Sequence, residues 1–143
     1  MKFKMLLSII AIMMLASVIQ IAAQNTRGTT RDGAVQIEGK GVEDELDGSD
    51  DSYWYKFTAG PGKITITFEV EANETNAGAK LDISTLEAAK PILSDVLVQG
   101  VDKGTDRVVK TLKLTKEQTL ILRVKGIKYG DSGGTGKYTV IIS

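Results

Sequence analysis

Six carboxylates in one short segment are the residues of this chain best suited to binding a metal ion. They are Glu43, Asp44, Glu45, Asp47, Asp50 and Asp51. Calcium prefers several hard oxygen ligands, and an Asp-, Ser- and Gly-rich turn supplies both carboxylates and backbone carbonyls. The spacing is not that of an EF-hand loop, because the third position counted from Asp44 is Leu46. The alternative is a solvated turn whose charges keep a strand edge from pairing with other chains.

Aromatic residues follow this acidic segment directly, with Tyr-Trp-Tyr at residues 53–55 and Phe at 57. Successive side chains of a strand point to opposite faces. Tyr53, Tyr55 and Phe57 therefore share one face, which we predict to be core, and Trp54 lies on the other. An exposed Trp54 would suit a sugar ring or a peptide. The alternative is that a loop or the end of the fold covers Trp54.

The composition restricts the catalytic chemistry that the chain can perform. There is no His and no Cys, which excludes Ser–His–Asp and Cys–His catalysis and the zinc sites that contain His. A hydrolase would have to use a pair of carboxylates, yet no Asp or Glu stands in a sequence context that indicates a deep cleft. We therefore expect no enzymatic activity, and a carboxylate-based hydrolase is the less favoured alternative.

Short strand-like runs, separated by turn residues, are the elements that must position these side chains. In the most regular run, Ile64, Ile66, Phe68 and Val70 alternate with polar residues, which is typical of a half-buried strand. Runs at this spacing predict an all-β fold, an antiparallel β-sandwich of about eight strands with jelly-roll-like order. The runs cover residues 34–40, 53–58, 63–70, 79–85, 94–99, 107–114, 118–125 and 137–142.

The N-terminal residues have the features of a secretory signal peptide. Lys2 and Lys4 precede an apolar run, and Ala22 and Ala23 precede a polar residue, which predicts a signal peptide over 1–23 with cleavage after Ala23. An uncleaved membrane anchor is the alternative. Residues 24–33 are expected to form a flexible lead-in and residues 34–143 a single domain. We expect the protein to be secreted or to lie in the periplasm or cell envelope.

The charge of the exported part does not favour nucleic acid as a partner. Loss of Lys2 and Lys4 reduces the 18 basic residues to 16, against 18 acidic residues. A nucleic-acid-binding domain usually carries an excess of positive charge. The membrane is an expected partner only if the N-terminal segment stays attached.

Two segments resemble the bacterial pre-peptidase C-terminal (PPC) domain. Residues 47–70 read DGSDDSYWYKFTAGPGKITITFEV, with an acidic turn, an Asp before paired aromatics, Phe-Thr-Ala, a glycine turn and an alternating strand. The ending, LILRVKG at 120–126 and GKYTVII at 136–142, is similar to the close of that family. The resemblance covers about residues 34–143, with a looser match over residues 79–93.

This resemblance implies a secreted, jelly-roll-like β-sandwich that acts in binding, secretion or stability and not in catalysis. Such domains are usually attached to extracellular proteases or other exported enzymes. Some relatives, including the collagen-binding modules of bacterial collagenases, bind calcium where the N-terminal segment meets the acidic turn. Carried over to this chain, the ligands would be Asp47, Asp50 and Asp51, with Glu43 and Glu45 upstream.

Together these observations predict a secreted, non-catalytic binding module with calcium as its expected metal. The expected partner is an extracellular or envelope protein. A carbohydrate-binding module that uses Trp54 to hold a polysaccharide is the alternative.

Overall fold

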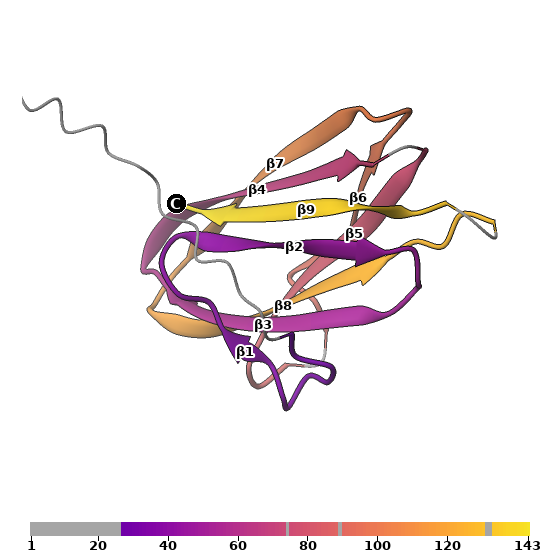
Figure 1. Ribbon diagram of the computed structural model, residues 1–143. Coiled ribbons are helices and arrows are strands. Elements are labelled where there is room, and N and C mark those ends of the chain that lie inside the picture. The colour runs from indigo at the N-terminus through magenta and orange to yellow at the C-terminus, as the bar shows by residue number, and fades with distance from the viewer. Residues whose placement is uncertain (1–26, 74, 89, 131–132) are drawn as a thin grey trace, which may run out of the picture.

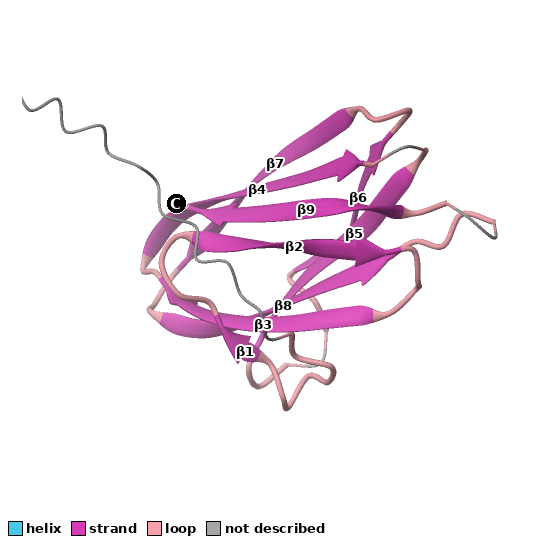
Figure 2. Cartoon of the chain, in the orientation of Figure 1, coloured by secondary structure: helices cyan, strands magenta, loops and turns pink. Residues whose placement is uncertain are grey.

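The computed structural model describes residues 27–143 apart from residues 74, 89 and 131–132, and this part of the chain forms nine strands in two sheets with no helix (Figures 1 and 2). The predicted signal peptide over residues 1–23 lies outside the described residues. Among the residues described, the structure has no helix of the length and apolar character needed to span a bilayer.

The two sheets pack face to face as a sandwich. One contains, in spatial order, β1 (Val35–Gln36), β3 (Ser52–Ala59), β8 (Gln118–Gly126), β5 (Ala77–Thr85) and β6 (Leu93–Gly100). The other contains β2 (Gly41–Asp47), β9 (Thr135–Ile142), β4 (Gly62–Ala72) and β7 (Thr105–Leu114). Apart from the parallel β1–β3 contact, the pairings are antiparallel. With β1 set aside, this strand order is that of a jelly roll, so the predicted fold class is confirmed.

Alternating side chains fill the space between the sheets. Ile66, Phe68 and Val70 of β4 are almost completely buried, as their period of two predicted. On β3, Tyr53, Tyr55 and Phe57 are buried and Trp54 is not, which confirms the predicted division of the aromatic residues. Since the chain contains no Cys, the apolar burial between the two inner faces is the main force that holds the sheets together.

The first part of the domain differs from the prediction. Of the run predicted at 34–40, only Val35–Gln36 is strand, and the segment expected to be an acidic turn begins as β2, Gly41–Asp47. The turn itself is confined to residues 48–51, where Gly48 has a φ of 81°. Strand β2 was missed because Asp44 stands between the buried Val42 and Leu46 and interrupts the apolar alternation.

Residues 27–33, within the expected flexible lead-in, contact the five-stranded sheet at the edge of β3 and on its outer face. The backbone N–H of Trp54 donates to the Gly28 carbonyl at 2.9 Å. The Arg31 guanidinium donates to Ser84 Oγ at 2.8 Å and to the carbonyl oxygens of Thr85 and Ala88. This covering segment explains why Ile121, which breaks the apolar alternation of β8, is only 2% exposed.

Candidate functional site

The acidic residues singled out in the sequence do not act as one group, because β2 divides them between its two faces. Glu43, Glu45 and Asp47 are exposed on the outer face, whereas Asp44 points inward between the buried Val42 and Leu46. Asp50 and Asp51 are exposed in the following turn. The five predicted calcium ligands therefore come from the outer face of a strand and from the turn beyond it.

Two of these carboxylates already have partners within the fold. Asp47 Oδ1 accepts hydrogen bonds from Ser49 Oγ at 2.6 Å, from the Ser49 N–H at 3.0 Å and from the Tyr53 hydroxyl at 3.2 Å. The Ser49 hydrogen bonds are the main reason that the pKa of Asp47 is lowered. Glu43 forms an exposed ion pair with Lys137 at 3.4 Å. Asp47 thus serves to close the turn between β2 and β3.

Within the described ranges, no three acidic residues lie close enough together to hold a metal ion. The donors as placed do not fit a calcium ion, which takes six to eight oxygen ligands. Calcium binding by Asp47, Asp50, Asp51, Glu43 and Glu45 stays a prediction, and it would require the turn to rearrange.

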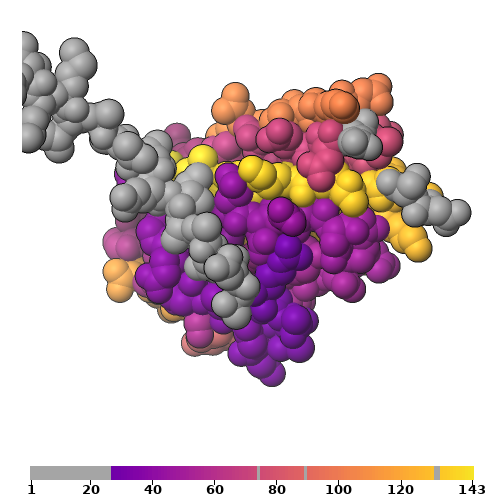
Figure 3. Space-filling model, viewed as in Figure 1, coloured from indigo at the N-terminus to yellow at the C-terminus, as the bar shows by residue number. Residues whose placement is uncertain are grey.

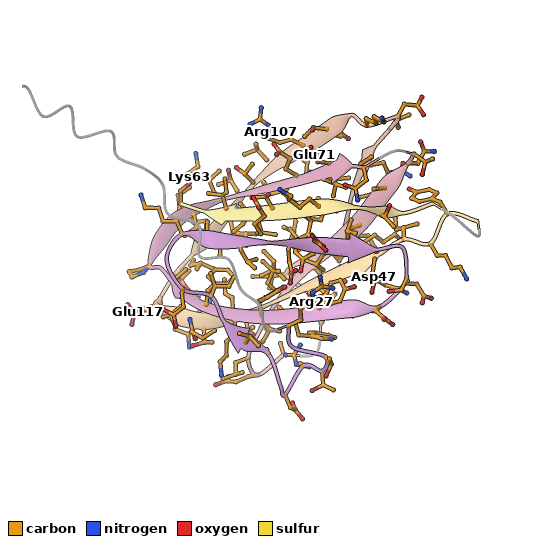
Figure 4. The ribbon with its side chains drawn as sticks, in the orientation of Figure 1. Arg27, Asp47, Lys63, Glu71, Arg107 and Glu117 are labelled. Carbon is orange, nitrogen blue, oxygen red and sulfur yellow. The ribbon has the colours of Figure 1, made fainter. Side chains whose placement is uncertain are left out.

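The inward-facing Asp44 belongs instead to a cluster of polar side chains between the sheets. Arg27 donates to it twice, from Nε to Oδ2 and from Nη2 to Oδ1, both at 2.8 Å. The Arg27 guanidinium also lies 4.5 Å from the centre of the Tyr53 ring, a cation–π contact. Figure 4 shows Arg27 beside the front edge of the sandwich, between β2 and β3. Although burial opposes the charged form, Asp44 holds the pKa of Arg27 above its ordinary value.

Two buried tyrosines extend this cluster across the core. The Tyr55 hydroxyl donates to Asp44 Oδ2 at 3.4 Å and lies 2.5 Å from the Tyr138 hydroxyl, so the Tyr138 hydroxyl is left to donate to the Tyr55 oxygen. The Tyr53 and Tyr138 rings stack with centroids 6.0 Å apart. Burial raises the pKa of Tyr55 to about 12 and raises that of Tyr138 further. Both hydroxyls are therefore protonated at neutral pH.

The cluster of Arg27, Asp44, Tyr53, Tyr55 and Tyr138 connects β2, β3, β9 and the N-terminal segment. Sequence reasoning placed Tyr53 and Tyr55 in the core but did not find Arg27 or Tyr138 as polar partners. One signal was available: a single carboxylate at the inward position between Val42 and Leu46 needs a buried partner. The cluster is a structural connection, because Arg27, Asp44, Tyr55 and Tyr138 bind one another and the Tyr53 hydroxyl donates to Asp47.

Trp54 lies half-buried on the outer face of β3, the opposite face from the core tyrosines. The Arg123 guanidinium lies 5.3 Å from the Trp54 ring centre, and Arg123 Nε donates to Ser52 Oγ at 2.9 Å. A cavity of about 80 Å³ opens beside the ring, whereas small-molecule sites usually measure about 300–1,000 Å³. Its lining residues are Arg31, Trp54, Asp82, Ser84, Pro91, Ile121 and Arg123.

Binding of a carbohydrate by Trp54 therefore stays a prediction. Arg123 already occupies a position over the ring, and a sugar that stacks there would have to displace it.

A larger hollow of about 440 Å³ lies at one end of the sandwich, open to solvent. Glu87 and Glu117 contribute its two carboxylates, with Lys116 beside them. Its walls come from the end of β5 and from the turn between β7 and β8. Glu87 and Glu117 are both exposed.

No family model matches this chain, and no curated protein matches it. Similar solved structures include the pre-peptidase C-terminal domain of collagenase from Bacillus anthracis, with 17% sequence identity, a TM-score of 0.48, and coverage of 77% of this chain and 94% of that chain. A second is a family GH115 4-O-methyl-α-glucuronidase with specificity for decorated arabinogalactans, with 11% identity, a TM-score of 0.44, and coverage of 68% of this chain and 14% of that chain. A domain of the PPC type, the family that the sequence motifs resemble, is thus among the structures similar to this chain.

We expect Arg27→Ala to lower the free energy of unfolding by about 1–3 kcal/mol, because it leaves Asp44 nearly buried without its charged partner. The matched control is Lys137→Ala, which removes an exposed ion pair with Glu43 and should cost about 1 kcal/mol or less. Urea unfolding of both variants measures the difference. Equal losses would show that the Arg27–Asp44 pair has no special structural role.

Alkaline pH should destabilise the fold through the buried tyrosines. Because the pKa of Tyr55 is raised to about 12 from about 10 in an unfolded chain, the stability it contributes is complete below pH 10 and is lost as pH rises to 12. Tyr55→Phe should make the unfolding free energy decline less steeply over that range. The measurement is urea unfolding at pH 9 to 12, and identical slopes in native and variant proteins would contradict the assignment.

Thermal unfolding with and without calcium tests the predicted metal site. Binding at the turn should raise the unfolding midpoint of the native chain in roughly 1–10 mM calcium, the range suited to extracellular modules. The Asp50→Ala/Asp51→Ala variant should show no such rise. A native midpoint that calcium leaves unchanged would remove the metal from the description of this protein.

Proposed function

We propose that this chain is a non-catalytic module of an exported protein and that it binds a protein partner outside the cytoplasm. The single observation that carries the proposal is the distribution of exposed apolar side chains. Five large apolar side chains in the described residues are between 45% and 59% exposed. They are Leu86, Ile92, Leu97, Val101 and Val109.

All five belong to β6, to β7 or to the connections at the two ends of β6, with Leu97 on the outer face of the five-stranded sheet and Val109 on the outer face of the four-stranded sheet. Leu86 and Ile92 belong to the connection between β5 and β6, Leu97 to β6, Val101 to the connection between β6 and β7, and Val109 to β7. Strands β6 and β7 are edge strands of the two sheets and lie next to each other across the sandwich. Figure 3 shows β7, in orange, at the rim of the molecule. We name this set of five side chains the β6–β7 side.

Exposed apolar side chains that follow one edge of a small domain support a protein-binding role. Such groups typically mark interaction sites, whereas scattered single residues do not. Protein interfaces combine an apolar centre with a polar rim. On the β6–β7 side, Lys80 and Asp95 form an exposed ion pair near Leu97, and Arg107 pairs with Glu69 near Val109. These charges supply such a rim.

Export rests on two features of the sequence, the signal-peptide pattern over residues 1–23 and the resemblance to PPC domains. Both support a partner outside the cytoplasm. The proposal requires no metal and no catalytic group.

A photoreactive amino acid in place of Leu97, in the chain exported by its own host, tests this function. Thr58, exposed on the outer face of β3, is the matched control position away from the β6–β7 side. We expect one discrete cross-linked product from position 97, with a mass different from a dimer of this chain, and none from position 58. Absence of a product at 97, or the same products at both positions, would overturn the proposal.

A further inference from the structure

The two edges of the four-stranded sheet carry opposite charges. Strand β2 contains Glu43, Asp44, Glu45 and Asp47 and no basic residue. Strand β7, at the other edge, contains Arg107, Lys110 and Lys113, with Asp106 as its only acidic residue. Figure 1 shows these strands on opposite sides of β9 and β4, and Figure 4 places Arg107 and Asp47 at the two edges.

Both edge strands have backbone groups that no other described strand of the same molecule pairs with. Among the described residues, β2 pairs only with β9 and β7 only with β4. Each strand therefore presents backbone N–H and C=O groups on its outer side, which is a template for a further strand. One N–H on each edge, that of Glu45 and that of Arg107, donates to the side chain of the preceding Asp. In the part of the chain that the structure describes, Lys110 and Lys113 have no ion-pair or hydrogen-bond partner for their side chains.

We propose that β2 of one copy pairs with β7 of the next copy, so that the four-stranded sheet continues from molecule to molecule. The strand directions allow this. Each of the three successive pairs β2–β9, β9–β4 and β4–β7 is antiparallel, so β2 and β7 run in opposite directions. A second copy in the same orientation thus brings its β2 antiparallel to β7, the pairing already used throughout this sheet.

One register matches the side chains on the inner face. It places Gly41 opposite Lys113 and Asp47 opposite Arg107, so that all 7 residues of β2 lie within the 10 residues of β7. On the inner face, where even-numbered residues of both strands lie, the opposed pairs are Val42–Leu112, Asp44–Lys110 and Leu46–Val108. Directly opposed residues of antiparallel strands interact, favourably when charges are opposite or when both side chains are apolar.

Registers shifted by two residues also keep the inner faces of the two strands together, but they do not give these favourable pairs. A shift of two residues in one direction places Leu46 opposite Lys110, and a shift in the other direction places Val42 opposite Lys110. A lysine on the inner face of an edge strand normally discourages pairing with an apolar strand. When Lys110 instead lies opposite Asp44, its charge favours β2 as the partner strand and favours this one register.

Asp44 already binds Arg27, so Lys110 would share this carboxylate. A carboxylate has about four acceptor positions, and all are used, two by Arg27, one by Tyr55 and one by the Glu45 N–H. Lys110 would take the position of the Glu45 N–H, which a strand paired along β2 would bind in place of Asp44. The proposed contact joins two different surfaces, β2 of one copy and β7 of the next. Contacts of this kind build rings or open chains of copies and not a closed two-fold dimer. This inference goes beyond the proposed function, since it concerns copies of this chain and does not depend on the foreign partner.

Sedimentation analysis of the exported chain tests the inference with two variants, each altered on one edge. Lys110→Glu places a like charge opposite Asp44, and Glu43→Lys/Glu45→Lys makes the outer face of β2 basic. All three positions are exposed, so both variants should fold. Lys110→Glu should keep the native thermal midpoint, and Glu43→Lys/Glu45→Lys should lower it slightly, because it also removes the exposed ion pair between Glu43 and Lys137. We expect the mass of the native chain to rise past that of a dimer with concentration at low salt and to fall in 1 M salt, where screening is strong.

Each variant alone should associate at least about tenfold more weakly than the native chain, because opposed like charges suppress a contact. An equimolar mixture still contains one intact acidic β2 and one intact basic β7, and it should form a 1:1 dimer that does not grow further. Any one of three results would overturn the inference. The native chain could stay monomeric, the Lys110→Glu variant could associate like the native chain, or the mixture could form no dimer. A cross-link from Leu97 to another protein would still support the proposed function in any of these cases.

Discussion

The ion pair between Arg27 and Asp44 is the contact that holds together the edge of the sandwich where β2 and β3 lie side by side. Asp44 is an inward-facing carboxylate between Val42 and Leu46, and an unpaired charge at such a position would oppose folding. Arg27 supplies the opposite charge from a different part of the chain, and Tyr55 and the Glu45 N–H also donate to the carboxylate. One interaction thus positions β2 relative to β3 and holds the N-terminal segment against both.

The regular strands could be predicted from the sequence, and the strands next to this contact could not. Residues 63–70 alternate without exception, so their strand, face and burial follow from the period of two alone. At β2, Asp44 interrupts the alternation, and the compensating Arg27 lies in a segment that has no pattern of its own. Strand β2 and the docking of residues 27–34 were therefore missed for the same reason, namely that each depends on a contact between segments distant in the sequence.

The candidate site was only partly predictable for a related reason. Residue types identified the acidic segment and Trp54, but the chemistry of both depends on neighbours that the fold supplies. Strand β2 turns alternate carboxylates to opposite faces, and Arg123 comes to lie over the Trp54 ring from the neighbouring strand β8. The surfaces that the fold leaves available are instead its edges, with exposed apolar side chains on the β6–β7 side and opposite charges on β2 and β7. These depend on strand order, which spacing along the chain does not reveal.

The central claim is that residues 27–37 are an integral part of the sandwich, held by Arg27 and by backbone pairing with β3. Hydrogen exchange of the Trp54 amide tests this most directly, because that N–H donates to the Gly28 carbonyl and depends on no other strand. The account predicts that it exchanges as slowly as amides in the centre of β8, such as that of Leu122. Exchange as fast as in an exposed turn would contradict the claim and show that this segment does not stay docked on the sheet.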